Sequence, residues 1–376
     1  MTSHNTTQAY VLEKVDAPFI LRDVILDTVR DDEVLVEIKY TGLCHTDLVV
    51  QQGGMPGNFP AVLGHEGVAV VKHVGAAVKD KTLSPGDTVI LSYHNCKACR
   101  QCHEGRGGAC IKMTELNFLT SRLGDPKTSF SLPDGTPVHG QFFGQSSLSR
   151  MAVVAQHSVV KIEGARPEDL AALPPLACGY LTGAGTVLNV LKPRTDDTVA
   201  VLGAGAVGFA AIMAAKVSGA KAIIAVDIVE EKLQLALSLG ATHVINTSAT
   251  RDLDSAIRAT FPDGVDRILD TTGVEVLLNG AFRALAHDGT LALVGVPSQT
   301  AELKFNALEM LSTCKKVVGV IEGHADSQKL IPYMVQLHRD GKFPVEKICK
   351  MYAAEDLDKA LADLKAGKVI KPILSW

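Results

Sequence analysis

The chain has 376 residues, of which 47% are hydrophobic and 21% charged, with a formal net charge of −4 at pH 7. This composition predicts a globular α/β protein, and the length predicts two domains because single cores seldom grow beyond about 250 to 300 residues. The charge gives no basic footprint for nucleic acid, and no apolar run reaches the roughly 18 residues of a membrane span.

The start of the chain, Met1 to Asn5, has no positive segment followed by an apolar one. No secretory signal is therefore expected, and the predicted location is cytoplasmic, with no nucleic-acid or membrane partner. Eight cysteines are too few for a disulfide-built scaffold, and in a reducing compartment clustered cysteines favour a metal site. Cys314 and Cys349 have no partner pattern, so we expect both to be buried small apolar side chains.

Short strands separated by turns are predicted from Ala9 to about Gly179. Residues 34–39 alternate apolar and polar side chains as a half-buried strand does. Further apolar runs rich in β-branched residues predict strands at 68–74, 88–91, 151–154 and 159–162. This part of the chain therefore predicts a β-rich, barrel-like domain.

Two short motifs at strand ends supply half a metal site. Cys44-His45-Thr46-Asp47 follows the first of these strands, and Gly64-His65-Glu66 precedes the next. Thiolate and imidazole are zinc ligands, although such a run taken alone is more often an ordinary loop. Cys178, far downstream, adds a second thiolate. Two thiolates and one imidazole leave a fourth position open, which is typical of a catalytic zinc.

Four further cysteines follow the pattern Cys96-x2-Cys99-x2-Cys102-x7-Cys110. Four thiolates at this spacing can close a tetrahedral zinc that pins a loop without an apolar core. An iron–sulfur cluster is the alternative, but in ferredoxin motifs the fourth cysteine comes after three residues and precedes proline, whereas Cys110 precedes Ile111. A nucleic-acid zinc finger is disfavoured because no helix with a histidine pair follows. Structural zinc is the favoured interpretation.

A helix is predicted from Pro167-Glu168-Asp169, because proline and acids suit a first helical turn. We expect Leu170 and Leu173 to pack against the core. Pro174-Pro175 should end this helix shortly before Cys178.

From Thr198 the periodicity changes to alternating strands and helices. Residues 199–202 predict a buried strand, Gly203-x-Gly205-x-x-Gly208 a tight turn, 209–218 a helix, and 222–226 a second strand ending at Asp227. In this strand–turn–helix context the glycines predict a dinucleotide site, with the pyrophosphate at the helix N-terminus. Asp227 should bind the ribose hydroxyls and repel a 2′-phosphate, so NAD is expected rather than NADP. A helix N-cap for 230–239 is an alternative role for Asp227 that the same position allows.

The alternation continues to the C-terminus. Apolar runs predict strands at 243–245, 267–270 and 291–294, helices at 252–259 and 274–285, and finally helices at 327–339 and 355–365 with a strand at 372–374. Such units form an open, doubly wound parallel sheet with helices on both faces. The chain is expected to return to the first domain near 318–322.

These motifs resemble the zinc-containing medium-chain alcohol dehydrogenases over essentially the whole chain. Within that family, segments 141–147 (QFFGQSS), 182–185 (TGAG) and 322–323 (EG) are most similar to the aryl (benzyl) alcohol dehydrogenase branch. The resemblance implies a GroES-like β-rich catalytic domain over residues 1–179 with 322–376, and a Rossmann NAD-binding domain over 180–321. It also implies two Zn²⁺ ions per chain, NAD, and a homo-oligomer.

The resemblance also implies roles for the residues of the first site. The catalytic zinc ligands would be Cys44, His65 and Cys178. Thr46 would hydrogen-bond the reacting oxygen and start the proton's exit, while Asp47 would orient His65. Glu66 would lie behind the zinc, with a buried ion pair as its alternative role. Val49 stands where many family members place a histidine at the outer end of the proton relay.

Cofactor and substrate contacts follow in the same way. His45 and Lys371 would meet the pyrophosphate, and Lys232 the adenosine ribose; exposed surface charge is the alternative for both lysines. Backbone groups of Val294 and Val320 would hold the carboxamide. The substrate pocket would be lined by Tyr93 and Phe142.

The expected function is that of a zinc-dependent oxidoreductase moving a hydride between NAD and a primary, aromatic alcohol or its aldehyde. Zinc would lower the alcohol's pKa from about 16 to roughly 7, which permits hydride loss at neutral pH. One alternative is a polyol or secondary-alcohol dehydrogenase of the same fold, although Cys178 argues against branches that use glutamate there. Another is a non-catalytic NAD-binding redox sensor, which retention of the three ligands and Thr46 disfavours.

Overall fold

The computed structural model describes residues 6–119, 122, 125, 127–167, 169–248 and 252–376. Met1 to Asn5 and Glu168, on which two of the sequence predictions rest, lie outside the described residues. The chain divides into two compact units. The first comprises Met1–Cys178, Asp326–Val335 and Val345–Trp376, and the second comprises Gly179–Ala325 and Gln336–Pro344.

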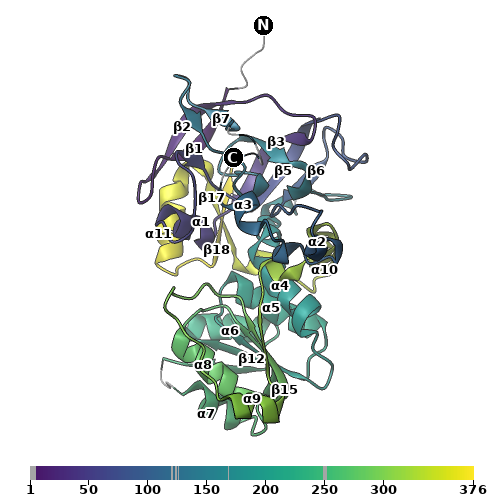
Figure 1. The fold of residues 1–376 in the computed structure, drawn as a ribbon, viewed down its shortest axis with the longest axis vertical. Coiled ribbons are helices and arrows are strands. Elements are labelled where there is room, and N and C mark those ends of the chain that lie inside the picture. The colour runs from purple at the N-terminus through teal and green to yellow at the C-terminus, as the bar shows by residue number, and fades with distance from the viewer. Residues whose placement is uncertain (1–5, 120–121, 123–124, 126, 168, 249–251) are drawn as a thin grey trace. The chain divides into compact units, whose positions relative to one another are not determined.

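Two β-sheets form the first unit (Figure 1). The larger, seven-stranded sheet has the order β10 (Val159–Lys161), β6 (Thr88–Leu91), β5 (Gly67–Val74), β3 (Glu33–Gly42), β18 (Lys371–Ser375) and β17 (Cys349–Ala353), with β9 (Met151–Ala155) also paired to β3. The smaller sheet has the order β4 (Ala61–Val62), β1 (Thr6–Leu12), β2 (Phe19–Leu26), β7 (Phe130–Ser131) and β8 (Pro137–Val138).

Strand β3 is the centre of the first unit because it pairs with three neighbours, β5, β9 and β18, all antiparallel. Its apolar residues Val34, Val36 and Ile38 are almost fully buried, as β-branched side chains on a central strand should be. Figure 1 shows the yellow C-terminal strands β17 and β18 lying with the purple and blue strands of this unit. The C-terminal segment therefore completes the sheet that the N-terminal segment begins.

The first unit also contains α-helices and 3-10 helices. The α-helices are α1 (His45–Gln51), α2 (Arg100–His103), α3 (Met113–Asn117), α11 (Leu357–Lys365) and the part of α10 (Ser327–Arg339) up to Val335. The 3-10 helices are η1 (Gly107–Ala109), η2 (Phe142–Gly144), η3 (Gln156–Ser158), η4 (Leu170–Ala172), η5 (Pro174–Ala177), η8 (Val345–Ile348) and η9 (Ala354–Asp356). Helix α11 buries Leu357, Ala360, Leu361 and Leu364, the i, i+3, i+4, i+7 spacing of an amphipathic helix.

The second unit is a parallel six-stranded sheet. Its order is β13 (His243–Asn246), β12 (Ala222–Asp227), β11 (Thr198–Leu202), β14 (Val265–Asp270), β15 (Leu285–Leu293) and β16 (Lys316–Gly319). The helices are α4 (Gly179–Gly185), π-helical η6 (Thr186–Leu191), α5 (Ala206–Val217), α6 (Glu230–Leu239), α7 (Leu253–Arg258), α8 (Glu275–Ala284), α9 (Ala307–Thr313) and 3-10 η7 (Glu322–His324).

This strand order makes the second unit doubly wound. The first strand in the sequence, β11, lies between β12 and β14, so the connections run outward in both directions from a switch point beside it. Sheet residues such as Ile224 and Ile268 pack with Leu253 of α7 and Phe282 of α8 in one buried cluster. The structure thus contains both the β-rich domain and the open parallel sheet that the sequence predicts.

Two predicted helices differ from the structure. The helix expected from Pro167 is wrong, because residues 170–177 form two 3-10 turns that bury Leu173 but only half-bury Leu170. Helix α5 begins at Ala206, so Gly208 lies in its first turn and not before the helix.

The expectation for Cys314 is also wrong. It is exposed, with a left-handed backbone (φ 54°) at the end of α9. Cys349 is half-buried, and its thiol donates a hydrogen bond to the carbonyl of Val345. Among the described residues, none of the helices combines the length and apolar character that crossing a bilayer requires.

Candidate metal and cofactor sites

The described residues contain two groups of three or more side chains whose ligand atoms all lie within 4.8 Å of one another. One group is Cys44, His65, Glu66 and Cys178, and the other is Cys96, Cys99, Cys102 and Cys110. Both lie in the first unit.

The ends of two paired strands bring the first group together. Cys44 is the N-cap of α1, two residues after β3, and His65 and Glu66 immediately precede β5. Because β3 and β5 are antiparallel neighbours, the end of one meets the start of the other. Cys178 follows η5, where the Ser92 hydroxyl donates a 2.6 Å hydrogen bond to the carbonyl of the preceding Ala177.

Asp47 joins the two ligand segments. Its Oδ1 accepts from the backbone N–H of Gly64 and lies 3.1 Å from Nδ1 of His65, while its Oδ2 accepts from the backbone N–H of Cys44. Gly64 must be glycine here, since its φ is +89° and a Cβ would lie 2.4 Å from the backbone nitrogen of Leu148. With Nδ1 on Asp47, only Nε2 of His65 remains for a further ligand.

The ligand atoms of this group fit a divalent cation. His65 Nε2 is buried and has no hydrogen-bond partner among the described residues. The pKa of Cys44 is lowered well below its ordinary value by a hydrogen bond with Cys178 and by the charges of Lys371 and His65. Burial opposes protonation of His65, but the charges of Asp47 and Cys44 raise its pKa well above the ordinary value. A thiolate at Cys44 beside the buried, unpaired Nε2 of His65 fits zinc, which takes thiolate and imidazole ligands.

Glu66 and Lys371 form a buried ion pair beside these ligands. Lys371 Nζ lies 2.8 and 2.9 Å from the two carboxylate oxygens of Glu66 and donates to the carbonyl of Leu43 at 3.2 Å. Burial raises the pKa of Glu66, and Lys371 opposes that rise. The Lys371 side chain is only 3% exposed, so exposed surface charge is wrong as its alternative role. From the sequence, a buried ion pair is the alternative role of Glu66, and the structure contains this pair.

Helix α1 presents the other predicted residues of this site. Thr46 is half-buried, and its Oγ1 lies 3.8 Å from the Cys44 sulfur. His45 is exposed at the first position of α1, and Val49 is half-buried one turn further along. The structure therefore brings Thr46 to the ligand group, while His45 faces solvent.

Aromatic side chains enclose His65. Phe143 stacks on the imidazole with ring centroids 4.6 Å apart, and Phe142 meets it edge-on at 5.5 Å. Phe118 packs on both phenylalanines, and Tyr93 is almost fully buried. The sequence prediction included Tyr93 and Phe142 but missed Phe143, because no sequence pattern signals that two successive side chains reach the same ring.

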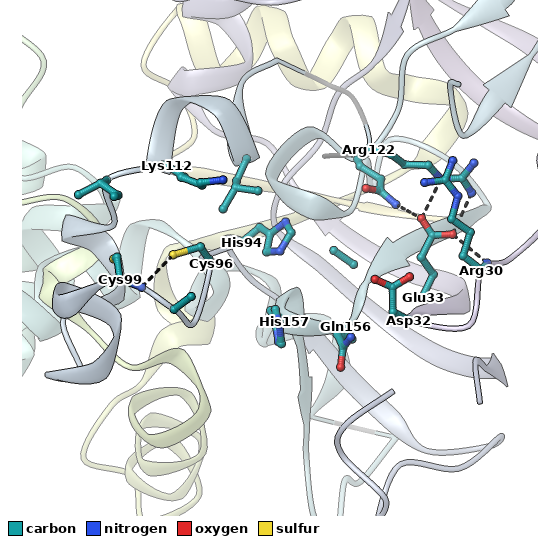
Figure 2. Close-up of a pocket in the computed structure, with 15 residues that line it drawn as sticks. Arg30, Asp32, Glu33, His94, Cys96, Cys99, Lys112, Arg122, Gln156 and His157 are labelled. Atoms are coloured by element: carbon teal, nitrogen blue, oxygen red, sulfur yellow. Dashed lines mark hydrogen bonds and ion pairs between the residues drawn. The ribbon is translucent and has the colours of Figure 1, made fainter. Parts of the chain in front are cut away.

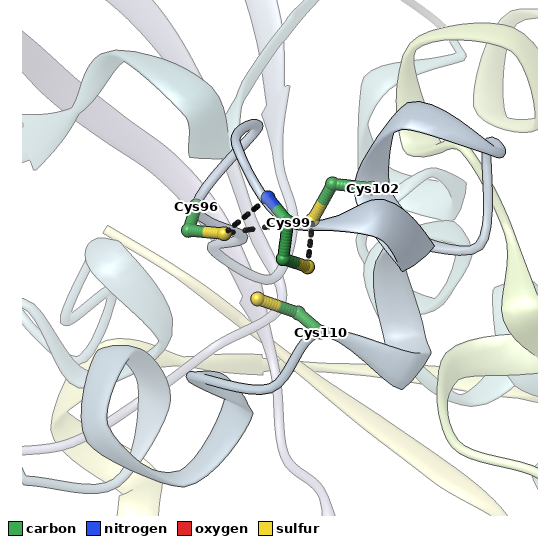
Figure 3. Close-up of side chains that lie close together, drawn as sticks. All are labelled: Cys96, Cys99, Cys102 and Cys110. Carbon is green, nitrogen blue, oxygen red and sulfur yellow. Dashed lines mark hydrogen bonds between the residues drawn. The ribbon is translucent and has the colours of Figure 1, made fainter.

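The second group is a compact set of four sulfurs. The Cys102 sulfur lies 3.5 Å from that of Cys99 and 3.9 Å from that of Cys96, and Figure 3 shows all four side chains converging. Zinc–sulfur bonds of about 2.3 Å give tetrahedral edges of roughly 3.8 Å, so these separations suit zinc. Backbone N–H groups of Cys102 and Ile111 lower the pKa of Cys99 to about 6, which favours the thiolate that a metal requires.

A cavity of about 580 Å³ is lined in part by Cys96 and Cys99 (Figure 2). Its lining includes His94 and His157, whose rings lie 5.9 Å apart. Burial and the nearby charges of His157 and Lys97 lower the pKa of His94 to about 3, so it is neutral near pH 7. The sequence prediction did not include this cavity.

Each of the three glycines in the predicted dinucleotide motif has its own structural explanation. Gly203 has φ +93°, and a Cβ there would lie 2.4 Å from Thr271 Oγ1. A Cβ on Gly208 would lie 1.8 Å from the Gly203 carbonyl oxygen, so α5 could not pack so closely on β11. Gly205 faces open space as the N-cap of α5, where a ligand phosphate could approach the first-turn N–H groups.

Asp227 lies at the carboxyl end of β12 and holds the glycine turn. One carboxylate oxygen accepts from the N–H of Ala204 at 2.7 Å, and the other accepts from Ile228 and Val229 at 2.8 and 3.0 Å. The N-cap of α6 is Val229, so the N-cap role considered for Asp227 is wrong. Lys232 is half-buried in the first turn of α6.

Val294 and Val320 follow the adjacent strands β15 and β16. Their N–H groups donate to the carbonyls of Asp270 and Leu293, at 3.0 and 2.9 Å. Both residues therefore lie at the carboxyl edge of the parallel sheet, as do Gly203 and Asp227, which is where open α/β sheets bind ligands.

The chain is similar to known proteins over nearly its whole length. Residues 30–164 match the family model "Alcohol dehydrogenase GroES-like domain", and residues 206–337 match "Zinc-binding dehydrogenase". The chain is 37% identical to the geraniol dehydrogenase of Castellaniella defragrans, over 98% of this chain and 97% of that protein.

Two solved structures have nearly the same fold. An alcohol dehydrogenase zinc-binding domain protein from Burkholderia ambifaria has a TM-score of 0.94 at 42% identity, and benzyl alcohol dehydrogenase from Acinetobacter calcoaceticus has a TM-score of 0.92 at 38% identity. In both cases the match covers 99% of each chain.

Proposed function

Because the chain belongs to the zinc-containing medium-chain alcohol dehydrogenase family, we propose that it interconverts primary, benzylic alcohols and their aldehydes with NAD as the hydride carrier. The family membership makes it an oxidoreductase of small alcohols; the aromatic substrate and NAD are the proposal. In this account the first unit performs catalysis and the second binds the cofactor.

The observation that carries the proposal is the group formed by Cys44, His65 and Cys178, with His65 Nε2 buried and unpaired among the described residues. Two thiolates and one imidazole would hold a zinc ion and leave a position for substrate. Zinc would supply Lewis acidity that lowers the pKa of the alcohol from about 16 toward neutrality, and NAD would accept the hydride. Glu66 does not fill that position as long as Lys371 holds both of its oxygens.

The protein's own residues would orient the substrate and remove its proton. Asp47 keeps a proton on His65 Nδ1 and so leaves Nε2 as the free nitrogen. Thr46, next to the ligand Cys44, can accept the proton of the substrate hydroxyl in a hydrogen bond and pass its own proton toward solvent. Oxidation of the alcohol then releases one hydride to the cofactor and one proton to water.

The aromatic preference rests on the surroundings of His65. Phe142 and Phe143 both make ring contacts with its imidazole, and rings of this kind favour offset or edge-on contact with another π system. The relatives named for benzyl alcohol and for geraniol also act on primary alcohols. A benzylic alcohol is therefore the substrate class that we propose.

The choice of NAD rests on Asp227. Its carboxylate accepts three backbone hydrogen bonds at the end of β12, which leaves acceptor capacity for ribose hydroxyls and a negative charge against a 2′-phosphate. Lys232 on α6 would contact the same ribose, and the backbones of Val294 and Val320 the carboxamide. His45, exposed at the start of α1, would contact the pyrophosphate, whereas Lys371 would do so only by leaving Glu66.

We also propose two zinc ions per chain, the second one structural, because the four cysteine sulfurs lie at separations that suit a tetrahedral zinc. None of the eight cysteines, all of which lie in the described part of the chain, forms a disulfide, which fits a reducing, cytoplasmic location. A homo-oligomer acting on small molecules completes the proposal.

A screen of NADH and NADPH formation tests the proposal. Purified protein is given benzyl, cinnamyl, short aliphatic, secondary and polyol substrates with each cofactor, and kcat/KM is compared. The highest value is expected for benzyl or cinnamyl alcohol with NAD. A higher value for a polyol or a secondary alcohol would contradict the aromatic assignment, and absence of turnover with every alcohol would favour a redox sensor.

A further inference from the structure

The segment Gln141–Ser147, here called the 141–147 loop, has an unusual backbone. Gln141, Phe143, Gly144 and Ser146 all have left-handed φ angles, of 60°, 54°, 69° and 62°. Side chains other than glycine rarely adopt this conformation, and for a bulky aromatic residue it is an outlier. Such strain persists only where the surroundings over-determine the backbone, and it gathers at functional sites.

Buried hydrogen bonds hold the start of the 141–147 loop. The side-chain amide of Gln141 donates to Glu33 at 2.7 Å, and Glu33 is held in turn by Arg122, as Figure 2 shows for that ion pair. The backbone N–H of Phe142 donates to the Ser146 hydroxyl, which donates to the carbonyl of Val62. These contacts anchor the loop to β3 and to the strand β4.

The end of the 141–147 loop holds the backbone around His65. Gln145 Oε1 accepts from the N–H of Gly67 at 3.1 Å, and its Nε2 donates to the carbonyls of His65 and Leu91 at 2.9 and 2.8 Å. The N–H of Ser147 donates to the carbonyl of Gly64. The loop is therefore fastened to the residues on both sides of His65.

The left-handed turn also explains how two successive side chains reach one ring. In an extended chain the side chains of Phe142 and Phe143 would point to opposite sides. Here Phe143 stacks on the imidazole of His65 at 4.6 Å with an interplanar angle of 28°, and Phe142 lies edge-on at 83°. All three rings are buried. Asp47 holds the Nδ1 atom of His65, and Gln145 holds its backbone carbonyl. Phe143 covers one face of the imidazole ring, which neither of these contacts touches.

We propose that Phe143 is a positioning residue for His65, whose stacked ring, held by the strained 141–147 loop, fixes the plane of the imidazole and so the direction of Nε2. The inference rests on the ligand role of His65 in the proposed function, and it is independent of the substrate class and of NAD. The unfavourable backbone conformation at Phe143 places this ring against the imidazole.

The test compares Phe143→Leu with Phe143→Tyr and with Phe118→Leu as the matched control. Phe118 belongs to the same aromatic group and contacts Phe142 and Phe143 rather than His65. Each variant is measured without alcohol or NAD, for metal affinity at the Cys44–His65–Cys178 group by chelator competition and for the visible spectrum after Co²⁺ replaces the metal there. Since neither readout involves turnover, failure of the aromatic or NAD assignment would not affect them.

Phe143→Leu is expected to weaken metal binding at this group by about 10- to 100-fold, the usual effect of losing an outer-shell partner, and to shift or broaden the Co²⁺ bands. Phe143→Tyr should restore both properties, and Phe118→Leu should resemble the wild type. Wild-type affinity and spectrum in Phe143→Leu, or equal changes in Phe118→Leu, would overturn the proposal.

A second variant keeps the test decisive if Phe143→Leu does not fold. Gln141→Met removes the hydrogen bond to Glu33 at the loop's anchor without touching His65, and Glu33 keeps its partner Arg122. Its Co²⁺ spectrum should shift in the same direction by a smaller amount. A stable Gln141→Met protein with the wild-type spectrum would count against control of the imidazole by the loop.

Discussion

Single hydrogen bonds decide which atoms of the metal-binding side chains remain available. Asp47 accepts from Cys44 and Gly64 and faces His65, so one carboxylate sets two ligand segments at once. Lys371 pairs with both carboxylate oxygens of Glu66 and so occupies them. The sequence identified Asp47 and Glu66 as neighbours of ligands, but the partner of Glu66 lies 305 positions away in the chain, and no local pattern predicts such a contact.

Thr46 is the predicted exit for the substrate's proton. Thr46→Val should lower kcat for benzyl alcohol oxidation by about 10²- to 10⁴-fold, the range for losing acid–base assistance, while Thr46→Ser should keep most activity because it retains the hydroxyl. Val49→His should accelerate turnover only below neutral pH, if proton transfer limits the rate there. Steady-state kinetics decides the matter, and wild-type turnover in Thr46→Val would rule out this exit route.

Asp227 is the residue on which the cofactor preference depends. Asp227→Ala should raise KM for NAD by about 10- to 100-fold, as expected for a lost hydrogen bond to a charged group, and should narrow the preference over NADP. Asp227→Asn keeps one carbonyl acceptor and removes the charge, so it should mainly improve the use of NADP. Unchanged KM values for both cofactors in both variants would show that Asp227 does not face the ribose.

At the scale of single elements, the sequence predicts regular strands and helices better than strained turns. The strand 88–91 and the helices 230–239 and 327–339 have the predicted bounds, because apolar periodicity directly reflects burial on one face. The 3-10 turns at 170–177 and the left-handed 141–147 loop were not predicted, since they depend on partners such as Glu33 and Val62 that are remote in the sequence.

The four-cysteine segment should act on stability more than on chemistry. Cys99→Ser should reduce the zinc content by one ion per chain and lower Tm, at about 2 to 4 °C for each kcal/mol of lost stability, while kcat per folded molecule changes little. Calorimetry with elemental analysis measures both effects. The exposed Cys314→Ser is the matched control and should change neither. Iron with sulfide in place of zinc would refute the assignment.

The cavity beside that segment predicts a loss of stability in mild acid. Burial and the charges of Lys97 and Lys79 lower the pKa of His157 to about 4, from 6.5 in the unfolded chain. Between pH 4 and pH 6.5 the unfolded state therefore binds more protons than the folded state. The stability that neutral His157 contributes is fully present above pH 6.5 and is lost as the pH falls toward 4. From this residue, the free energy of unfolding changes with pH by at most about 1.4 kcal/mol per pH unit, and by less because the side chain is partly exposed.

His157→Gln tests this pH dependence. The fall in Tm between pH 7 and pH 5 should be smaller in the variant than in the wild type, because glutamine binds no proton. The exposed His73→Gln serves as the control and should keep the wild-type pH dependence. An equal fall in Tm for wild type and His157→Gln would contradict the sign or the size of this contribution.

At the scale of the whole molecule, the predicted family and fold class are confirmed. The glycine turn, the strand–helix alternation and the cysteine spacings each reflect a local physical requirement, and together they predict both units. The C-terminal strands β17 and β18 join the first unit's sheet, and the segment 336–344 groups with the second unit. The predicted domain boundaries do not assign residues 336–344 to the second unit. Helix α10 continues without a break from the first unit into this segment, so no turn or loop signal in the sequence indicates a boundary there.

We expect the oxidation of alcohols to require a zinc ion held by the Cys44–His65–Cys178 group. The most direct test is the initial rate of NADH formation from benzyl alcohol after a chelator has removed this metal and again after Zn²⁺ is returned. The rate should fall to background when the metal is removed, and it should recover in proportion to the zinc that rebinds. A rate that survives complete removal of the metal, or a fully reloaded protein that still forms no NADH, would contradict the claim.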